Sequence, residues 1–483
     1  MEGCGCPQRS GFAGRMMVVG FGCVGRGVLP LLLRHVVANA GQITVLAPPE
    51  CDTSLAASLG VRVERQKLTR DNHASLLGSL LQPGDFLLNL SVDVGSADLI
   101  AWCQPRGVLY LDACTEPWAG GYADASLTPE QRTNHALRSR VLELRRERPG
   151  GPTAVLTHGV NPGLVSHFVK QALLNLAADL APGRAEPTNR EEWATLACDL
   201  GIRAIHIAER DTQAAFVRRQ RGEFVNTWSV EGLANEACQP AELGWGSHER
   251  SLPANAHRIE RPDGAVVWLE SPGGATKVRS WTPLGGAYEG FLITHSESLS
   301  IADYLTLHDG GRVVYRPTVH YAYRPCDDTV ASLDELAGRN GQLQPRKRVL
   351  GPDDIVSGMD ELGVLLLGHA RSAYWYGSRL TIEEARTLCP GNTATSLQTA
   401  AGVLAGVVWA IGHPEQGIVE PDEMPFREIL DVATPYLGEM AGVYGDGAAS
   451  SGWCLPNEEK PADKGDPWQF SSMLVRPVCV QDD

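Results

Sequence analysis

Acidic and aromatic side chains stand inside otherwise apolar segments at several places along the chain, and their chemistry is the first clue to function. Carboxylates pair with ammonium groups, and the face of a tryptophan attracts a cation. A histidine beside them could move a proton. The residues of these types are Glu209, Asp211, Trp228, Glu231, Glu236, Glu242, His295, Glu297, Asp360 and Glu361. Together they indicate a pocket for a positively charged ligand.

Each of these residues has a simpler structural explanation when it is taken alone. A carboxylate between short strands is commonly a solvated loop residue. A lone tryptophan is commonly a core or interface anchor, and a lone histidine is commonly a hydrogen-bonded structural group. Spacing along the sequence does not bring the residues together, so whether they form one pocket stays open at this point.

A glycine-rich turn near the start of the chain predicts the element that would bring a cofactor to such a pocket. Met16 to Val19 is an apolar run typical of a buried parallel strand. Gly20-Phe21-Gly22-Cys23-Val24-Gly25 follows in the pattern G-x-G-x-x-G, and the apolar run Leu29 to Val36 continues as a helix. The first glycine makes the tight bend, the second lets backbone approach a pyrophosphate, and the third lets the helix pack on the strand. We therefore predict a nicotinamide dinucleotide site, with the helix N-terminus facing the negative charge.

The end of the second predicted strand, Gln42 to Leu46, departs from the usual pattern. An acidic residue about 20 positions beyond the glycines normally holds the adenosine ribose, but Ala47 stands there, followed by Pro48, Pro49 and Glu50. Glu50 could take that role from a displaced loop, or the ribose is held in another way. No basic residue comes directly after the strand to receive a 2′-phosphate, which favours NAD over NADP.

Three further apolar runs with polar ends predict the rest of a Rossmann-type, doubly wound parallel sheet. The runs are Gly84 to Asp93, Gly107 to Asp112 and Thr153 to Thr157, the last leading into Gly159-Val160-Asn161-Pro162-Gly163. A charged helix is predicted at Ala136 to Arg148. The carboxyl ends of such strands face the ligand crevice. Asn89, Ser91 and Asp93 are therefore expected to line the cofactor.

From about Asp199 to Tyr323 the chain changes to short alternating strands. This texture predicts a second α+β domain with a largely antiparallel sheet, which would cover the cofactor and bind substrate. The clearest runs are Ile202 to Ile207, Val266 to Glu270 and Gly290 to Thr294.

An apolar helix rich in small residues, Ser396 to Ala410, is expected to return to the first domain. It is too short and too interrupted for a membrane span. We predict an NAD-binding domain over residues 1–160, completed by a C-terminal segment from about 390 to 483, and a substrate-binding domain over 161–389.

The bulk properties narrow the class of protein. The chain has 483 residues, of which 43% are hydrophobic and 20% charged, as in a globular protein with more than one domain. A net charge of -15 argues against a nucleic-acid partner. Neither a membrane span nor an apolar signal-peptide core is seen, and twelve cysteines without a framework suit a reducing compartment, so a cytoplasmic location is predicted. Cys4 and Cys6 could hold a metal, but no second pair lies near them, and no metal is predicted.

Motifs along nearly the whole chain resemble those of bacterial homospermidine synthases, whose fold is related to saccharopine dehydrogenase. The matching strings include V-V-G-F-G-C-V-G-R-G-V-L-P, N-L-S-V-D, E-P-W, N-P-G-L-V-S, H-I-A-E-R-D-T-Q, V-N-T-W-S-V-E-G, Q-P-A-E-L-G-W-G, H-Y-A-Y-R-P-C-D-D and D-E-L-G-V-L-L-L-G-H. The resemblance implies a redox-neutral transferase that converts two putrescine molecules into sym-homospermidine and ammonia through imine intermediates. NAD would act as a bound hydride store, spermidine could also donate or accept the aminobutyl group, and the protein would be a homodimer.

The resemblance also implies roles for individual residues. Trp228 would steer cationic substrate and intermediates by cation–π contact, Glu209 and Asp360 would anchor ammonium groups, and Glu236 would bind substrate beyond the tryptophan. Glu116, Asn161 and His295 occupy matching pocket positions, and His295 or a nearby carboxylate would relay the proton. The predicted cofactor-binding residues are Gly20, Phe21, Gly22, Cys23, Val24, Gly25, Asn89, Ser91, Asp93, Ala113, Cys114 and Asn161. Two departures, Ala47 and the pair Val94-Gly95 after Asp93, bear on cofactor affinity.

Two other classes of function stay open on the sequence. A saccharopine or carboxynorspermidine dehydrogenase of the same fold would act on an amine or imine that carries a carboxylate, and would offer an arginine to it. Arg210 keeps that alternative open. A dinucleotide-binding sensor or scaffold without turnover is the other alternative, and it predicts that the pocket acids are dispensable.

Overall fold

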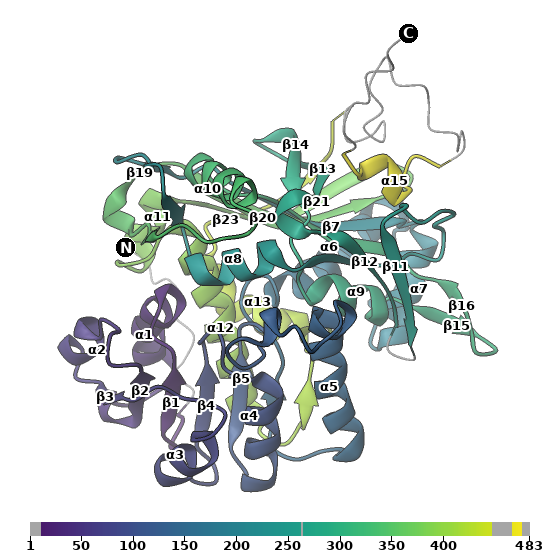
Figure 1. The fold of residues 1–483 in the computed structure, drawn as a ribbon. Coiled ribbons are helices and arrows are strands. Elements are labelled where there is room, and N and C mark those ends of the chain that lie inside the picture. The colour runs from purple at the N-terminus through teal and green to yellow at the C-terminus, as the bar shows by residue number, and fades with distance from the viewer. Residues whose placement is uncertain (1–10, 262–263, 447–465, 476–483) are drawn as a thin grey trace, which may run out of the picture.

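The computed structural model describes residues 11–261, 264–446 and 466–475, and two sheets organise them (Figure 1). Cys4 and Cys6, the pair considered for a metal, lie outside the described residues.

The first sheet has seven parallel strands in the order β22-β6-β5-β4-β1-β2-β3. The strands are β1 (Met16–Val19), β2 (Ile43–Ala47), β3 (Arg62–Arg65), β4 (Phe86–Asn89), β5 (Leu109–Asp112), β6 (Ala154–Val155) and β22 (Ile418–Val419). The predicted doubly wound parallel sheet is confirmed. In register, Val19 of β1 lies beside Leu46 on one side and Asn89 on the other, so the carboxyl ends of neighbouring strands meet at one edge.

Helices cover both faces of this sheet, and one of them comes from the far end of the chain. The helices are α1 (Cys23–His35), α2 (Ser54–Ser58), α3 (His73–Leu80), α4 (Ser96–Cys103), α5 (Asn134–Glu147) and α12 (Ala394–Gly412). α12 packs against α1 and β5, and also contacts strands of the second sheet. Its length and composition would allow a membrane span, but 83% of its most apolar window is buried inside the protein. α12 is therefore a core helix shared by both halves of the molecule.

The second sheet has ten strands and is antiparallel except between β7 and β17. Its members are β7 (Ala204–Asp211), β10 (Pro240–Gly244), β11 (Ala256–Arg261), β12 (Gly264–Pro272), β13 (Lys277–Thr282), β14 (Gly286–Phe291), β17 (Thr318–Arg324), β20 (Met359–Leu367), β21 (Ala373–Thr381) and β23 (Glu439–Tyr444). The largely antiparallel second sheet is as predicted. The C-terminal segment is divided between the sheets, because β22 joins the first and β23 pairs with β21 in the second.

Smaller elements surround the second sheet. Three strand pairs are β8 (Ala214–Ala215) with β19 (Ile355–Ser357), β9 (Glu223–Asn226) with β18 (Arg346–Val349), and β15 (Leu307–Asp309) with β16 (Arg312–Tyr315). The helices are α6 (Leu164–Leu180), α7 (Arg190–Asp199), α8 (Val230–Cys238), α9 (Glu297–Tyr304), α10 (Asp327–Gly338), α11 (Ile382–Leu388), α13 (Phe426–Ala433) and α15 (Phe470–Met473).

Several strand boundaries differ from the sequence prediction where charged residues lie inside strands. β7 was expected to end at Ile207, but it continues to Asp211, so Glu209 is a strand residue and not a loop residue. Likewise Asp360 lies within β20, opposite Asp211. β14 ends at Phe291, three residues before the predicted end. The physical reason for the first two differences is that these carboxylates are buried between paired strands, where periodicity predicts apolar side chains.

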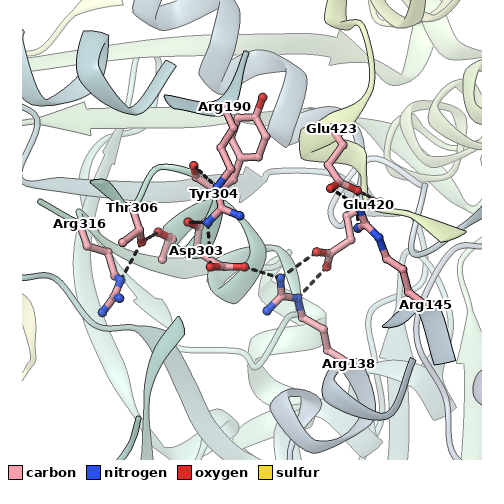
Figure 2. Close-up of polar contacts among 10 residues, drawn as sticks. Arg138, Arg145, Arg190, Asp303, Tyr304, Thr306, Arg316, Glu420 and Glu423 are labelled. Carbon is pink, nitrogen blue, oxygen red and sulfur yellow. Dashed lines mark hydrogen bonds and ion pairs between the residues drawn. The ribbon is translucent and has the colours of Figure 1, made fainter. Parts of the chain in front are cut away.

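An ion-pair cluster fixes α5 to the second half of the molecule (Figure 2). The guanidinium of Arg138, on α5, is 1% exposed and contacts Glu420 at 2.6 Å and Asp303 of α9 at 3.0 Å. Arg145, about two turns further along α5, pairs with Glu423 at 2.7 Å nearer the surface. The helix is thus held by a buried cation between carboxylates from two other segments.

Candidate active site

A cavity of about 350 Å³ opens between the glycine-rich turn of the first half and the carboxylate-bearing strands of the second. Residues from both halves line it. They are Gly20, Phe21, Gly22, Cys23, Val24, Pro48, Cys51, Asn89, Leu90, Ser91, Val92, Ala113, Cys114, Glu116, Asn161, Pro162, Glu209, Trp228, Ser229, Glu231, Gly232, Glu236, His295, Tyr321, Val349, Thr395 and Thr399. The structure therefore brings most of the predicted site residues to one place.

The glycine-rich turn has the geometry that a bound pyrophosphate requires. Gly20 has φ +86°, and a Cβ there would lie 2.8 Å from the carbonyl oxygen of Leu90. Beside the α-carbon of Gly22 there is open space, so a ligand can approach the backbone. Gly22 caps α1 without a side-chain hydrogen bond, and the first turn carries no acidic residue. Free N–H groups at a helix N-terminus favour an anion.

Two predicted cofactor residues lie outside the lining and support it from behind. A Cβ on Gly25 would lie 2.7 Å from the carbonyl oxygen of Gly20, so this glycine lets α1 pack on the turn. Asp93 has φ +62°, and its N–H donates to the carboxyl of Glu116 at 3.4 Å. Asp93 thus helps to position a pocket carboxyl.

At the end of β2 the cavity wall is made by Pro48 and Cys51. Glu50, the residue considered for the ribose, is exposed and does not line the cavity. Two arginines from other elements approach this end, and both are engaged: Arg26 pairs with Asp52 at 2.9 Å, and Arg65 donates to Thr53 at 2.8 Å.

The pair Val94-Gly95, one of the two departures from the family's motif, has a packing explanation. A Cβ on Gly95 would lie 2.6 Å from the indole nitrogen of Trp118, the tryptophan of E-P-W. Trp118 donates from that nitrogen to Asp98 at 2.6 Å. Glycine is therefore required at this position so that the loop carrying Glu116 can pack.

Glu209 is the central carboxyl of the acidic wall. The side-chain amide of Asn161 donates to it at 3.0 Å, and the hydroxyl of Tyr321 donates to the same oxygen. Burial raises the pKa of Glu209 to about 8, and the nearby charge of Asp211 acts in the same direction. The side chain therefore tends to hold a proton until a cation enters.

Asp360 lies behind this wall and does not line the cavity. Thr395, which does line it, donates to one oxygen of Asp360 at 2.6 Å. Burial and the charges of Glu209 and Asp211 raise the pKa of Asp360 well above its usual value. Asp360 thus contributes to the acidic wall through Thr395.

His295 lies between two carboxylates in the loop before α9. Its Nε2 is 3.2 Å from Glu236, and its Nδ1 is 3.2 Å from Glu297, the first residue of α9. Burial alone would lower the pKa of His295, but the two carboxylates outweigh burial and raise it well above the usual value. The imidazole is therefore held as a cation between two carboxylates.

Glu116 and Trp228 complete the polar wall. Burial raises the pKa of Glu116 to about 8, with the charge of Glu236 acting in the same direction. The indole nitrogen of Trp228 donates to Tyr323 at 3.2 Å, so the orientation of the ring is fixed. Trp228 is only partly buried, which leaves part of its surface available to the cavity.

Three residues with clear contacts in the site were missed from the sequence. Tyr321 binds Glu209, and its ring centroid lies 4.7 Å from that of His295. Thr395 and Thr399 stand one turn apart on the small-residue helix α12. A signal was present in each case: the spacing of Tyr321 and Tyr323 places both on one face of β17, and two hydroxyls four residues apart interrupt an apolar helix.

Three of the acids first singled out serve other parts of the fold. Glu242 accepts hydrogen bonds from the N–H groups of Asn134 and His135 at 2.7 and 3.1 Å, and so caps α5. The other two are bound within the second half of the protein: Asp211 to Thr227 at 2.7 Å, and Glu361 to Thr282 at 2.9 Å.

The lining of the cavity contains carboxyl, amide, hydroxyl and aromatic groups but neither arginine nor lysine among the described residues. Arg210 is turned away and donates to the carbonyl of Gly285. Within the part of the chain that the structure describes, no group of three potential metal ligands is found. Chemically, the site suits a cation with N–H donors placed beside a dinucleotide.

Comparisons with known proteins agree with this geometry. Residues 16–155 match the family model described as saccharopine dehydrogenase NADP binding domain, and residues 159–446 match the saccharopine dehydrogenase C-terminal domain. The chain is 52% identical to a homospermidine synthase from Blastochloris viridis over 96% of its length and 98% of that protein. It is 47% identical to one from Mesorhizobium japonicum over 97% and 98%. A crystal structure of the homospermidine synthase from Legionella pneumophila in complex with NAD superimposes with a TM-score of 0.87 at 43% identity, covering 96% of this chain and 98% of that one.

Proposed function

The chain belongs to the homospermidine synthase family, and we propose from that premise that its cavity joins two putrescine molecules into sym-homospermidine with release of ammonia. The observation that carries the proposal is one cavity that runs from the glycine-rich turn to a wall of carboxyls and Trp228, with no arginine or lysine among the described residues that line it. Spermidine fits the same chemistry as donor or acceptor, since it carries the same aminobutyl ammonium end.

NAD fits the first half of this cavity. The open space at Gly22 and the uncapped N-terminus of α1 would hold the pyrophosphate, and the polar strand ends at Asn89 and Ser91 would hold the remainder. When bound, NAD supplies a hydride acceptor that can return the hydride later in the same cycle. The chain's own residues do the rest: they bind the cation, orient it, exclude water and move protons.

The carboxyls would bind the distal ammonium group of the diamine. Glu209 holds a proton in the empty cavity because burial disfavours its charge. An ammonium group at this position favours the charged form of Glu209, because its positive charge stabilises the carboxylate in place of the water that burial has removed. The face of Trp228 would attract the same cation and its iminium derivatives.

The triad of Glu297, His295 and Glu236 would move the protons of the reacting amine. An amine must lose a proton before hydride can leave its carbon, and ammonia must gain one as it departs. His295 contacts both carboxylates at 3.2 Å, so a proton can be passed along the three groups without reaching bulk water. We assign His295 as the relay and Glu236 as its partner on the cavity side.

A dehydrogenase acting on a carboxylated amine is less compatible with the site. Such a substrate requires a cationic side chain for its carboxylate. In the part of the chain that the structure describes, no arginine or lysine lines the cavity, and Arg210 points elsewhere.

The decisive experiment is turnover of putrescine by the purified protein with NAD in catalytic amount. Homospermidine and ammonia should form in equal amounts with no net NADH. Stoichiometric NADH without homospermidine would contradict the proposal and favour the dehydrogenase alternative. A homodimer is a further prediction of the family resemblance, and light scattering on the purified protein tests it. The cytoplasmic location stays a prediction from the cysteine usage and the N-terminal sequence.

A further inference from the structure

The end of the cavity beside β2 lacks the acidic residue that usually holds the adenosine ribose. Ala47 ends β2 and is buried, and its partner in the parallel register with β3 is Arg65. An acid at the end of this strand normally binds the ribose 2′-hydroxyl of NAD, whereas a nearby arginine accommodates the 2′-phosphate of NADP. Taken alone, these two strand ends would therefore suit NADP better than NAD.

The loop after β2 brings a carboxylate back to this end of the cavity. Cys51 lines the cavity, its N–H donates to the carbonyl of Pro48 at 3.0 Å, and its thiol lies 3.6 Å from the carbonyl oxygen of Phe21. The loop thus folds back against the glycine-rich turn, and Asp52 follows directly. The side chain of Asp52 is 59% exposed, so a ligand at the cavity end can reach it.

Two donors fix the orientation of the Asp52 carboxylate. One oxygen accepts from the backbone N–H of Ser54 at 3.0 Å, and the other accepts from the guanidinium of Arg26 at 2.9 Å. Arg26 lies in the first turn of α1, where its N–H donates to the carbonyl of Gly22, the glycine with open space beside it. Each carboxylate oxygen can accept a second hydrogen bond, so the group can still receive a hydroxyl.

The same loop also engages the second arginine at this end. Arg65 donates to the carbonyl of Pro49 at 3.2 Å and to the hydroxyl of Thr53 at 2.8 Å. Both arginines that could receive a 2′-phosphate are therefore bound to the loop, and Arg26 is bound there by a negative charge. A 2′-phosphate would have to break these contacts and lie beside Asp52, and placing like charges together is unfavourable.

We propose that Asp52 takes the place of the acid missing at Ala47 and selects NAD over NADP. Its carboxylate accepts a hydrogen bond from the ribose 2′-hydroxyl. Its charge repels a 2′-phosphate, and its ion pair keeps Arg26 from binding one. The inference concerns the cofactor alone and does not depend on which amine the enzyme uses.

The test is direct binding of NADH and NADPH to the full-length protein after bound nucleotide has been removed, followed by the fluorescence of the reduced nicotinamide. In Asp52→Asn the side chain can still accept from Ser54, but the negative charge is gone and Arg26 has lost its ion pair. NADPH affinity should rise and NADH affinity should fall. The ratio of their dissociation constants should change by about tenfold or more, the usual effect of one hydrogen bond to a charged group.

The matched control is Glu50→Gln, which removes the same charge two residues earlier in the same loop. Glu50 is exposed and does not line the cavity. This variant should change the ratio by no more than about threefold, since exposed charges interact weakly. If Asp52→Asn and Glu50→Gln change the ratio equally, only net charge matters and the proposal is wrong.

A double variant tests the part played by the arginine. Asp52→Asn combined with Arg26→Met should lose the gain in NADPH affinity, because the guanidinium released by the first change is absent. A gain that survives in the double variant would overturn the role given to Arg26. Melting temperatures of all variants check that the fold is kept.

Discussion

At the scale of single residues, the cavity combines an aromatic face with carboxyls that are kept protonated by burial. Glu209 and Glu116 both have a pKa raised to about 8, and the charge of Asp211 or Glu236 adds to the effect of burial. His295 is shifted upward too, but by its two carboxylate neighbours. The empty site is therefore less negative than its count of acids suggests.

Replacing Trp228 by alanine should lower kcat/KM for putrescine roughly thirtyfold, because a desolvated cation–π contact contributes about 2 kcal/mol. Trp228→Phe keeps a weaker aromatic face, so its kcat/KM should lie between those of the wild type and the alanine variant. Steady-state kinetics on NAD-loaded protein measure the effect, with the melting temperature as a check on folding. An unchanged kcat/KM in a folded alanine variant would remove the assigned role.

Replacing Glu209 by glutamine should change how stability depends on pH. The native side chain, with its pKa raised to about 8, holds its proton up to about pH 8, whereas an ordinary glutamate has a pKa of 4.5. Between these values the native state binds a proton that the unfolded chain has lost, so this group makes stability fall as pH rises through the window. The glutamine variant lacks this pH-dependent loss of stability, because its side chain does not titrate.

The melting temperature of ligand-free Glu209→Gln, measured against wild type, should therefore improve steadily from pH 5 to pH 8 and then level off. Buried carboxyls away from Glu209 are present in both proteins and cancel in the difference, whereas Asp360 also loses the charge of Glu209 that helps to raise its pKa. If the melting temperatures of the two proteins differ by a constant amount over this pH range, Glu209 does not carry a raised pKa.

At the scale of elements, α5 and α12 connect the two halves. Arg138 holds α5 to Glu420 and Asp303, and it is almost fully buried. Removing it by Arg138→Met leaves the buried carboxylate of Glu420 without its cation and leaves Asp303 with Arg190 alone, and should cost about 3 to 5 kcal/mol of unfolding free energy. The matched control is Arg145→Met on the same helix, whose partly exposed pair with Glu423 should contribute no more than about 1 kcal/mol. Denaturant titration of both variants measures the difference, and equal losses would contradict a special role for Arg138.

The close approach of α12 to the turn that carries Asn161 gives a second prediction. A Cβ on Gly402 would lie 2.0 Å from the carbonyl oxygen of Gly159. Gly402→Ala must therefore push α12 away from this turn, and overpacking of this kind costs about 1 to 3 kcal/mol. Turnover should fall with stability, because Asn161 and Thr399 both line the cavity.

Gly412→Ala is the control on the same helix, since nothing lies within 4 Å of its Cβ position. It should leave activity unchanged and raise stability by about 0.5 kcal/mol through a less flexible unfolded chain. Melting curves and putrescine turnover of the two alanine variants can be compared directly. Similar behaviour of both would mean that α12 and the turn can separate freely.

At the scale of the whole molecule, the first sheet is not completed by the first part of the chain. β22 pairs with β6 at its edge, and α12 packs on α1 and β5. A fragment of residues 1–160 should therefore expose apolar surface and bind NAD far more weakly than the full chain. Dye binding to exposed apolar surface and NAD titration check this, and a well-folded fragment with full NAD affinity would support an independent first domain.

Much of the first sheet could be predicted, because buried parallel strands are short apolar runs and the G-x-G-x-x-G turn places one of them. The carboxylates of β7 and β20 were harder, since Glu209 and Asp360 inside strands contradict the pattern that defines a buried strand. The direction in which a side chain points was the hardest feature to predict. Glu242 is a carboxylate, as the pocket requires, but it points to the N-terminus of α5. Tyr321 and Thr395 were missed because each also fits a core position, and only the fold decides which side they face.

The late arrival of β22 and α12 has a consequence for the protein as it is made. The edge partner of β6 emerges from the ribosome about 260 residues after β6 itself. At translation rates of about 5 to 20 residues per second, the nascent nucleotide-binding half waits roughly 13 to 50 seconds with one strand edge unpaired and one face uncovered. Since unpaired edges and open apolar faces invite association with other chains, this interval is when the growing polypeptide most needs a chaperone.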